Sequence, residues 1–97
     1  MKNKNNNLFY KFYERFRIDP STEGGEYIDY MLTLTVAYDK VDTIDNLVVY
    51  ASRWYDKDIQ TVWDAVRKTF DSSILQSFSM NEAIKILQKE LLHELKK

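Results

Sequence analysis

The side chains of this 97-residue chain that could do chemistry gather on one polar stripe between residues 57 and 70. Apolar residues recur there at helical intervals, so a helix would hold the polar residues on its opposite, outward side. The outward set combines cations, an amide, a hydroxyl and a carboxylate: Lys57, Gln60, Thr61, Asp64, Arg67 and Lys68. Such groups bind phosphates and base edges, which indicates a nucleic-acid interface rather than a reaction centre.

A second amphipathic segment precedes this stripe and would position it. Two sets of apolar residues are expected to face inward: Ile44, Leu47, Val48, Ala51 and Trp54 from the first segment, and Ile59, Val62, Val66 and Phe70 from the second. Only residues 55–57 separate the two segments. Two helices joined by so short a turn form a helix-turn-helix, which places its second helix in the major groove of duplex DNA. Arg53, near the end of the first helix, is expected to join Lys57 and Lys68 at phosphates.

The rest of the composition offers little competing chemistry. The chain has no cysteine and one histidine, His93, which is too few for a zinc site of three or four ligands. No nucleophile with a base beside it and no glycine-rich phosphate loop accompanies the carboxylates, so we expect no metal, no cofactor and no enzymatic activity. No apolar run approaches the length of a membrane span, and the absence of cysteine fits a cytoplasmic protein.

Length and composition predict one globular domain, with 44% hydrophobic and 30% charged residues. Residues 1–7 are expected to form a flexible, basic, asparagine-rich leader, and residues 8–97 a single helix-turn-helix domain. Further helices are predicted over residues 8–17 and 80–95, and a loop over 20–25. The expected N-caps are Asp42 or Thr43, then Asp56, and finally Ser79 in a capping box with Glu82.

Residues 26–38 fit two kinds of secondary structure. Their apolar positions suit a buried helix, yet residues 32–36 alternate as a strand does, and Thr and Val favour sheets. A strand needs partners, and no other segment alternates as well. This favours a helix.

Two aromatic features also have alternative interpretations. The N-terminal cluster comprises Phe9, Tyr10, Phe12, Tyr13 and Phe16. It is either part of the core or a stacking platform for single-stranded nucleic acid, with Tyr10 and Tyr13 expected to be the most exposed. Trp63 either packs under the last helix or anchors a protein partner.

Several residues also resemble one protein family. Residues 18–28, in which Gly24 is followed by Tyr27 and Ile28, resemble the opening of the C-terminal DNA-binding domain of the sporulation-initiation response regulators of endospore-forming bacteria. Residues 62–67 resemble that family's recognition-helix pattern Val-x-x-Ala-Ile-Arg. The resemblance covers residues 8–96 and is to the DNA-binding domain alone, without the receiver domain that the family usually has. It implies an all-α, compact bundle of five to six helices containing a helix-turn-helix, and it favours a helix over residues 26–38.

The family resemblance and the charges lead to two functional hypotheses. The outward stripe and the resemblance favour a sequence-specific duplex-DNA-binding protein that regulates transcription. Because one such unit reads few base pairs, we expect a homodimer or tandem binding on repeated half-sites. However, Thr61 and Asp64 stand where the family has basic residues, and the net charge is −1, whereas DNA-binding domains are usually basic. The alternative is a stand-alone protein-interaction module or inhibitor, encoded by a phage or mobile element, that reuses the fold and presents Trp63.

Overall fold

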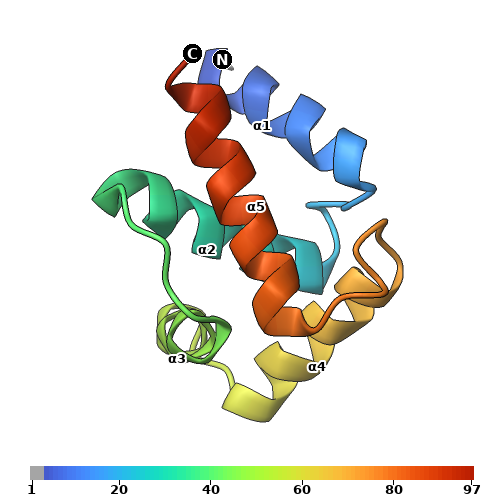
Figure 1. The fold of residues 1–97 in the computed structure, drawn as a ribbon. Helices are drawn as coiled ribbons and strands as arrows, with labels where there is room; N and C mark the ends of the chain where they lie inside the picture. Colours follow the sequence, from blue (N-terminus) through green and yellow to red (C-terminus); the bar gives the residue numbers. More distant parts are fainter. Residues whose placement is uncertain (1–3) are drawn as a thin grey trace.

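The computed structural model describes residues 4–97, with side chains from residue 9 onward, and all its regular structure is helical (Figure 1). The five helices are α1 (Lys4–Phe16), α2 (Glu23–Tyr38), α3 (Ile44–Trp54), α4 (Ile59–Asp71) and α5 (Met80–Leu95). They form one compact globule without a strand in the described residues. The predicted all-α bundle is confirmed, and so is the choice of helix over strand for residues 26–38.

The N-terminal boundaries differ from the prediction. Helix α1 begins at Lys4, within the expected leader, whose residues 1–3 lie outside the described residues. Helix α2 begins at Glu23, because Thr22 acts as its N-cap and accepts a hydrogen bond from the Gly25 backbone N–H at 3.0 Å. The predicted loop over residues 20–25 is therefore wrong in its second half.

The other helix starts show which local signals were correct. Thr43 caps α3, and Ser79 forms the predicted capping box with Glu82 on α5. The N-cap of α4 is Asp58, which accepts the Gln60 N–H at 3.0 Å, so the assignment of this role to Asp56 is wrong. Asp56 instead lies in the left-handed region at φ 52°, where the chain turns between α3 and α4.

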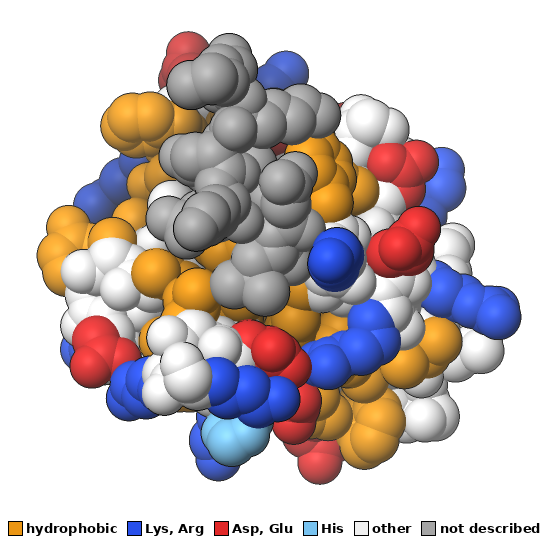
Figure 2. All heavy atoms as spheres, turned by 90° about the horizontal axis from the view of Figure 1, so that it is seen from above, with side chains coloured by type: hydrophobic (Ala, Val, Ile, Leu, Met, Phe, Trp, Pro, Cys, Tyr) orange, Lys and Arg blue, Asp and Glu red, His pale blue; other side chains and the backbone are white. Residues whose placement is uncertain are grey.

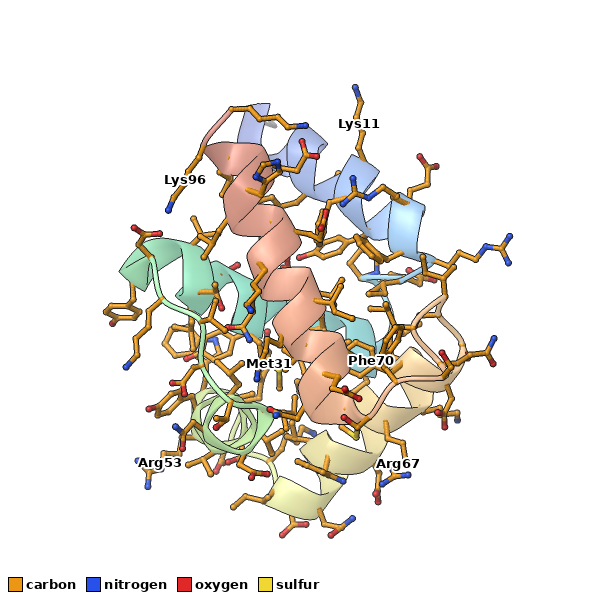
Figure 3. The ribbon with its side chains drawn as sticks, viewed as in Figure 1. Lys11, Met31, Arg53, Arg67, Phe70 and Lys96 are labelled. Carbon is orange, nitrogen blue, oxygen red and sulfur yellow. The ribbon has the colours of Figure 1, made fainter. Side chains whose placement is uncertain are left out.

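Helix α2 supplies much of the core, because its buried residues meet α3, α4 and α5. Tyr27, Ile28, Met31 and Leu32 are almost fully buried, and Phe70 of α4 joins the same cluster (Figure 3). Burying a large apolar side chain contributes about 1.5–3 kcal/mol relative to leaving it exposed. This cluster holds α4 in place from behind.

A glycine sets the distance between α2 and α4. A Cβ atom on Gly24 would lie 2.1 Å from the Ala65 carbonyl oxygen and 2.1 Å from Thr69 Oγ1, both on α4. No side chain can be accommodated at that separation without moving a helix. Gly24 is therefore required for the close packing of α2 against α4.

A buried amide ties the α2–α3 connection to α5. The Gln88 side chain accepts hydrogen bonds from the Asp42 N–H at 2.7 Å and Thr35 Oγ1 at 3.0 Å, and it donates to the Asp42 carbonyl at 2.8 Å. Gln88 is fully buried. Sequence analysis assigned it no role.

Helix α1 is held mainly by its aromatic side. Phe12, Tyr13 and Phe16 are buried, which confirms the core interpretation for these three rings, whereas Tyr10 is exposed. The expectation that Tyr13 is exposed is wrong, because its ring is buried among the core residues, and its hydroxyl donates a hydrogen bond to Asp29. Burial, and then this bond, raises the Tyr13 pKa. On the outer side, Arg15 forms ion pairs with Glu90 and Glu94 of α5.

Candidate nucleic-acid interface

Helices α3 and α4 pack against each other and are joined by the four residues 55–58. Within this turn the Lys57 N–H donates to the Ser52 carbonyl at 2.9 Å, and Asp56 takes the left-handed conformation. A helix pair with so short a turn has the arrangement of a helix-turn-helix. The second helix, α4, is the element whose outer surface could enter a groove of DNA.

The burial pattern of α4 separates its two sides. Val62, Val66 and Phe70 are buried on the inner side. All seven candidate nucleic-acid contacts are exposed: Arg53, Lys57, Gln60, Thr61, Asp64, Arg67 and Lys68. Figure 3 shows the guanidinium groups of Arg53 and Arg67 directed away from the fold. The predicted inward and outward sides of α4 agree with the structure at these positions.

Two apolar residues near this surface depart from expectation, and a third, Trp63, bears on the alternative function. Ile59 and Trp54 were predicted to face inward, but they are 51% and 69% exposed. Ile59 is the first residue of α4, one turn before the buried stripe begins, and Trp54 is the last residue of α3, stacked on Tyr30 at 5.5 Å. Trp63, for which both packing and a protein contact were considered, is partly buried and packs against the core. Trp54 is thus the more exposed tryptophan.

The charges along residues 53–71 cancel. Arg53, Lys57, Arg67 and Lys68 are matched by four carboxylates: Asp56, Asp58, Asp64 and Asp71. In the middle of the outer face, Asp64 accepts a hydrogen bond from Gln60 Nε2 at 2.8 Å. Within the described residues, none of the four cations forms an ion pair, so all are available to a ligand.

A cleft of about 580 Å³ beside α4 adds further charges of both signs. Arg17 and Lys68 line it together with Asp19 and Glu23. Glu23 also accepts a hydrogen bond from the Tyr27 hydroxyl at 2.7 Å; burial, and then this bond, raises the Tyr27 pKa to about 12. The carboxylates at the start of α2 would weaken phosphate binding on this side of α4.

On the face opposite α4, the described side chains carry charges of both signs. Figure 2 shows their lysines, arginines and carboxylates interspersed with hydrophobic side chains.

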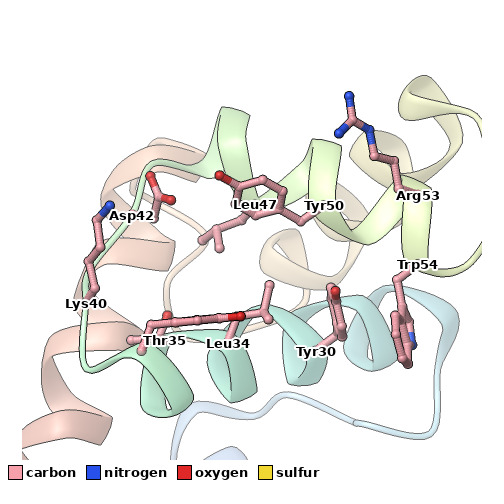
Figure 4. A pocket seen from close by; sticks show the side chains of 10 residues that line it. Tyr30, Leu34, Thr35, Lys40, Asp42, Leu47, Tyr50, Arg53 and Trp54 are labelled. Carbon is pink, nitrogen blue, oxygen red and sulfur yellow. The ribbon is translucent and has the colours of Figure 1, made fainter.

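Sequence analysis missed an aromatic groove between α2 and α3 (Figure 4). Its volume is about 710 Å³. The sequence did contain a signal: Tyr30, Leu34 and Tyr38 recur every four residues on α2, and Tyr50 and Trp54 do so on α3. Each helix thus carries apolar residues beyond those that face the core.

The described residues contain no group of three or more His, Asp or Glu side chains that could hold a metal ion, and His93 is exposed on α5. Over the same residues, each helix is too short or too polar to cross a bilayer.

Comparison with protein-family models, with curated proteins and with solved structures finds no match for this chain.

Proposed function

We propose that this protein binds duplex DNA by placing α4 in the major groove and that it acts as a sequence-specific transcriptional regulator. One observation carries the proposal. A helix anchored by Val62, Val66 and Phe70 presents a row of hydrogen-bonding side chains to solvent, directly after a four-residue turn. A buried inner side and a polar outer side on the second helix are what major-groove docking requires.

The exposed side chains suit different parts of a duplex. Gln60, Thr61 and Arg67 can reach base edges, with Arg67 suited to the O6 and N7 atoms of guanine. Lys57 and Lys68, with Arg53 behind them, can hold phosphates. Asp64 would repel phosphate, but it can accept a hydrogen bond from the N4 amino group of cytosine.

Because carboxylates balance the local cations, we expect modest affinity with a clear salt dependence. If roughly four phosphates are neutralised, log K falls with log salt at a slope of about −4. One such unit reads few base pairs, so useful specificity calls for two copies on repeated half-sites.

A selection from a randomised duplex library, followed by fluorescence anisotropy on the enriched sequence, tests this proposal. We expect Arg67→Ala to weaken binding by about tenfold or more, since a base contact is worth about 1–3 kcal/mol. Lys89→Ala, a change at an exposed cation on α5, is the matched control and should leave affinity unchanged. No enriched sequence, or an isotherm that is flat between low and moderate salt, would reject DNA binding.

One observation favours the alternative, a protein-interaction module that reuses this fold. The equal numbers of cations and carboxylates along residues 53–71 are unusual for a surface that binds a polyanion. Under this alternative the chain fails to shift any duplex at low salt. The exposed ring of Trp54, rather than that of Trp63, is then the better candidate for the partner contact.

A further inference from the structure

The groove between α2 and α3 has an apolar floor and aromatic walls. Leu34 of α2 and the buried Leu47 of α3 line it, and Tyr30 and Trp54 stack at one end with their rings 15° from parallel. Tyr50 also lines the groove, and Figure 4 shows its ring beside Leu47, across from α2.

Three exposed aromatic side chains line the groove, including the two most exposed of the described residues, Tyr38 and Trp54. Tyr38 is 75% exposed, Trp54 69% and Tyr50 42%. Contiguous exposed apolar surface of this kind marks an interaction site. Because protruding rings and a cavity occur on the same surface, a twofold axis through the groove would bring the rings of each copy to the cavity of the other.

The charges at the two ends of the groove fit the same symmetry. Arg53 lies at the Trp54 end, and Asp42 lies at the opposite end beside Lys40 (Figure 4). A twofold axis across the middle places Arg53 of one copy against Asp42 of the other, twice. Asp42 keeps one carboxylate oxygen for this contact, because its bonds from the Thr43 N–H and the Asn46 amide both use Oδ1.

The exposed rings supply part of the area that a dimer interface needs. An aromatic side chain buries about 150–250 Å² when covered, so the exposed parts of the three rings amount to on the order of 400 Å² per copy. A standard interface buries about 800 Å² per partner. The rings therefore account for about half of what a stable dimer needs, and the rim of the groove has to supply the rest.

We propose that the α2–α3 groove is the contact surface between two copies of this chain, related by a twofold axis. This inference goes beyond the proposed function and does not depend on DNA. The groove shares only Arg53 with the candidate DNA contacts, so the outer face of α4 stays free in the dimer. Arg53 then serves the contact between copies rather than a phosphate.

Sedimentation velocity of the purified chain without DNA, from low micromolar to submillimolar concentration, tests the proposal. We expect a concentration-dependent shift from monomer to dimer. Trp54→Ala and Tyr38→Ala should each raise the dissociation constant about tenfold or more. Phe78→Ala is the matched control, since Phe78 is an exposed ring outside the groove, and it should have no effect. Circular dichroism of each variant establishes that it is folded.

A charge exchange tests the pairing at the groove ends. Arg53→Asp and Asp42→Arg each place like charges together in a symmetric dimer, so each variant alone should associate more weakly than the original chain. Mixing the two variants restores both pairs and should restore association. If Asp42→Arg fails to fold because Asn46 and Thr43 lose their acceptor, the ring variants still decide the question.

Three results would overturn the proposal. These are a chain that stays monomeric at every concentration, a dimer that Trp54→Ala and Tyr38→Ala leave intact, and a dimer that Phe78→Ala weakens equally. A monomeric chain would leave the groove to a different protein. Because no DNA is present, failure here is distinguishable from failure of the DNA proposal, which the Arg67→Ala experiment tests.

Discussion

The outer face of α4 and the α2–α3 groove are both exposed, yet they present opposite kinds of side chain. On α4 the exposed residues between Gln60 and Lys68 are polar or charged, and only Ile59 at its start is apolar and exposed. The groove instead exposes Tyr38, Tyr50 and Trp54. Helix α4 is apolar on one side only, whereas α2 carries a second apolar row, in which Tyr30 and Leu34 are half-buried and Tyr38 is exposed. A second apolar row that the core covers only in part indicates a contact with another molecule.

The largest loss of stability is expected from a change at Gly24, where α2 supports α4 from behind. Gly24→Ala forces a Cβ into the Ala65 carbonyl and should destabilise the fold by about 3 kcal/mol, the upper end for overpacking, because α2 and α4 must separate. Urea denaturation measures this change. Thr33→Ala, at an exposed position of the same helix, should stay within about 0.5 kcal/mol of the original chain. Equal stability of the two variants would contradict the close packing of α2 on α4.

A slightly smaller loss of stability is expected from a change at Gln88, which supports one end of the α2–α3 groove. Gln88→Leu leaves the Asp42 N–H and carbonyl without partners and should cost about 2–3 kcal/mol, since an unsatisfied buried polar group costs about 1–3 kcal/mol. Hydrogen exchange at the Asp42 amide should accelerate more than exchange within α4. Uniform acceleration over the whole chain would instead indicate that Gln88 stabilises the entire fold rather than this end of the groove.

The helix caps and Gln88 show which features of the fold could be predicted from the sequence and which could not. Helix periodicity and helix caps are local properties, so the sequence predicted the cap at Ser79 and narrowed that of α3 to Asp42 or Thr43, of which Thr43 is correct. The role of Gln88 depends on a residue 46 positions away, so no local pattern revealed it.

The wrong predictions of side-chain exposure also arise from contacts between residues far apart in the sequence. Trp54 and Ile59 continue apolar stripes, but each lies at a helix end, where the neighbouring helices decide whether it is covered. Tyr13 is buried among the core residues, and its hydroxyl donates a hydrogen bond to Asp29 on another helix. The outward side of α4 was predictable because its buried side is apolar and its exposed side polar over the whole helix length.

Paired substitutions compare the two surfaces directly. Arg67→Ala should weaken DNA binding by about tenfold or more and leave self-association unchanged, whereas Trp54→Ala should do the reverse. Both residues are exposed, so each variant should lose less than about 1 kcal/mol of stability. Anisotropy and sedimentation on the same preparations measure the two effects. If each variant impaired both activities, the surfaces would not be independent.

A change in the turn should have a smaller effect on both surfaces. Asp56 has a left-handed backbone conformation, which costs free energy for Asp and which glycine adopts freely. Asp56→Gly should therefore stabilise the fold by a few tenths of a kcal/mol. Asp56→Val should destabilise it by about 1 kcal/mol, because a β-branched residue tolerates the left-handed conformation less well than Asp does. Thermal unfolding measures both changes, and a stabilising valine would refute the assigned turn geometry.

A last effect is absent at neutral pH and appears only at alkaline pH. The Tyr27 pKa is raised to about 12 in the fold, above its ordinary value near 10, so the folded chain holds this proton more tightly than the unfolded chain does. Tyr27 therefore contributes stability below pH 10 that is lost as the pH rises from 10 to 12. Tyr27→Phe should reduce the slope of stability against pH in this window. An unchanged slope would show that Tyr27 does not titrate there.

The contact at Gly24 also determines how α4 can meet a target. Because the backbones of α2 and α4 touch at the Ala65 carbonyl, no layer of side chains lies between them there to let α4 slide or roll. The helix reaches any ligand as a rigid, preorganised rod that loses little of its own freedom on binding. Whatever bends or rearranges to improve the fit must then belong to the ligand or to the long side chains on the surface of α4.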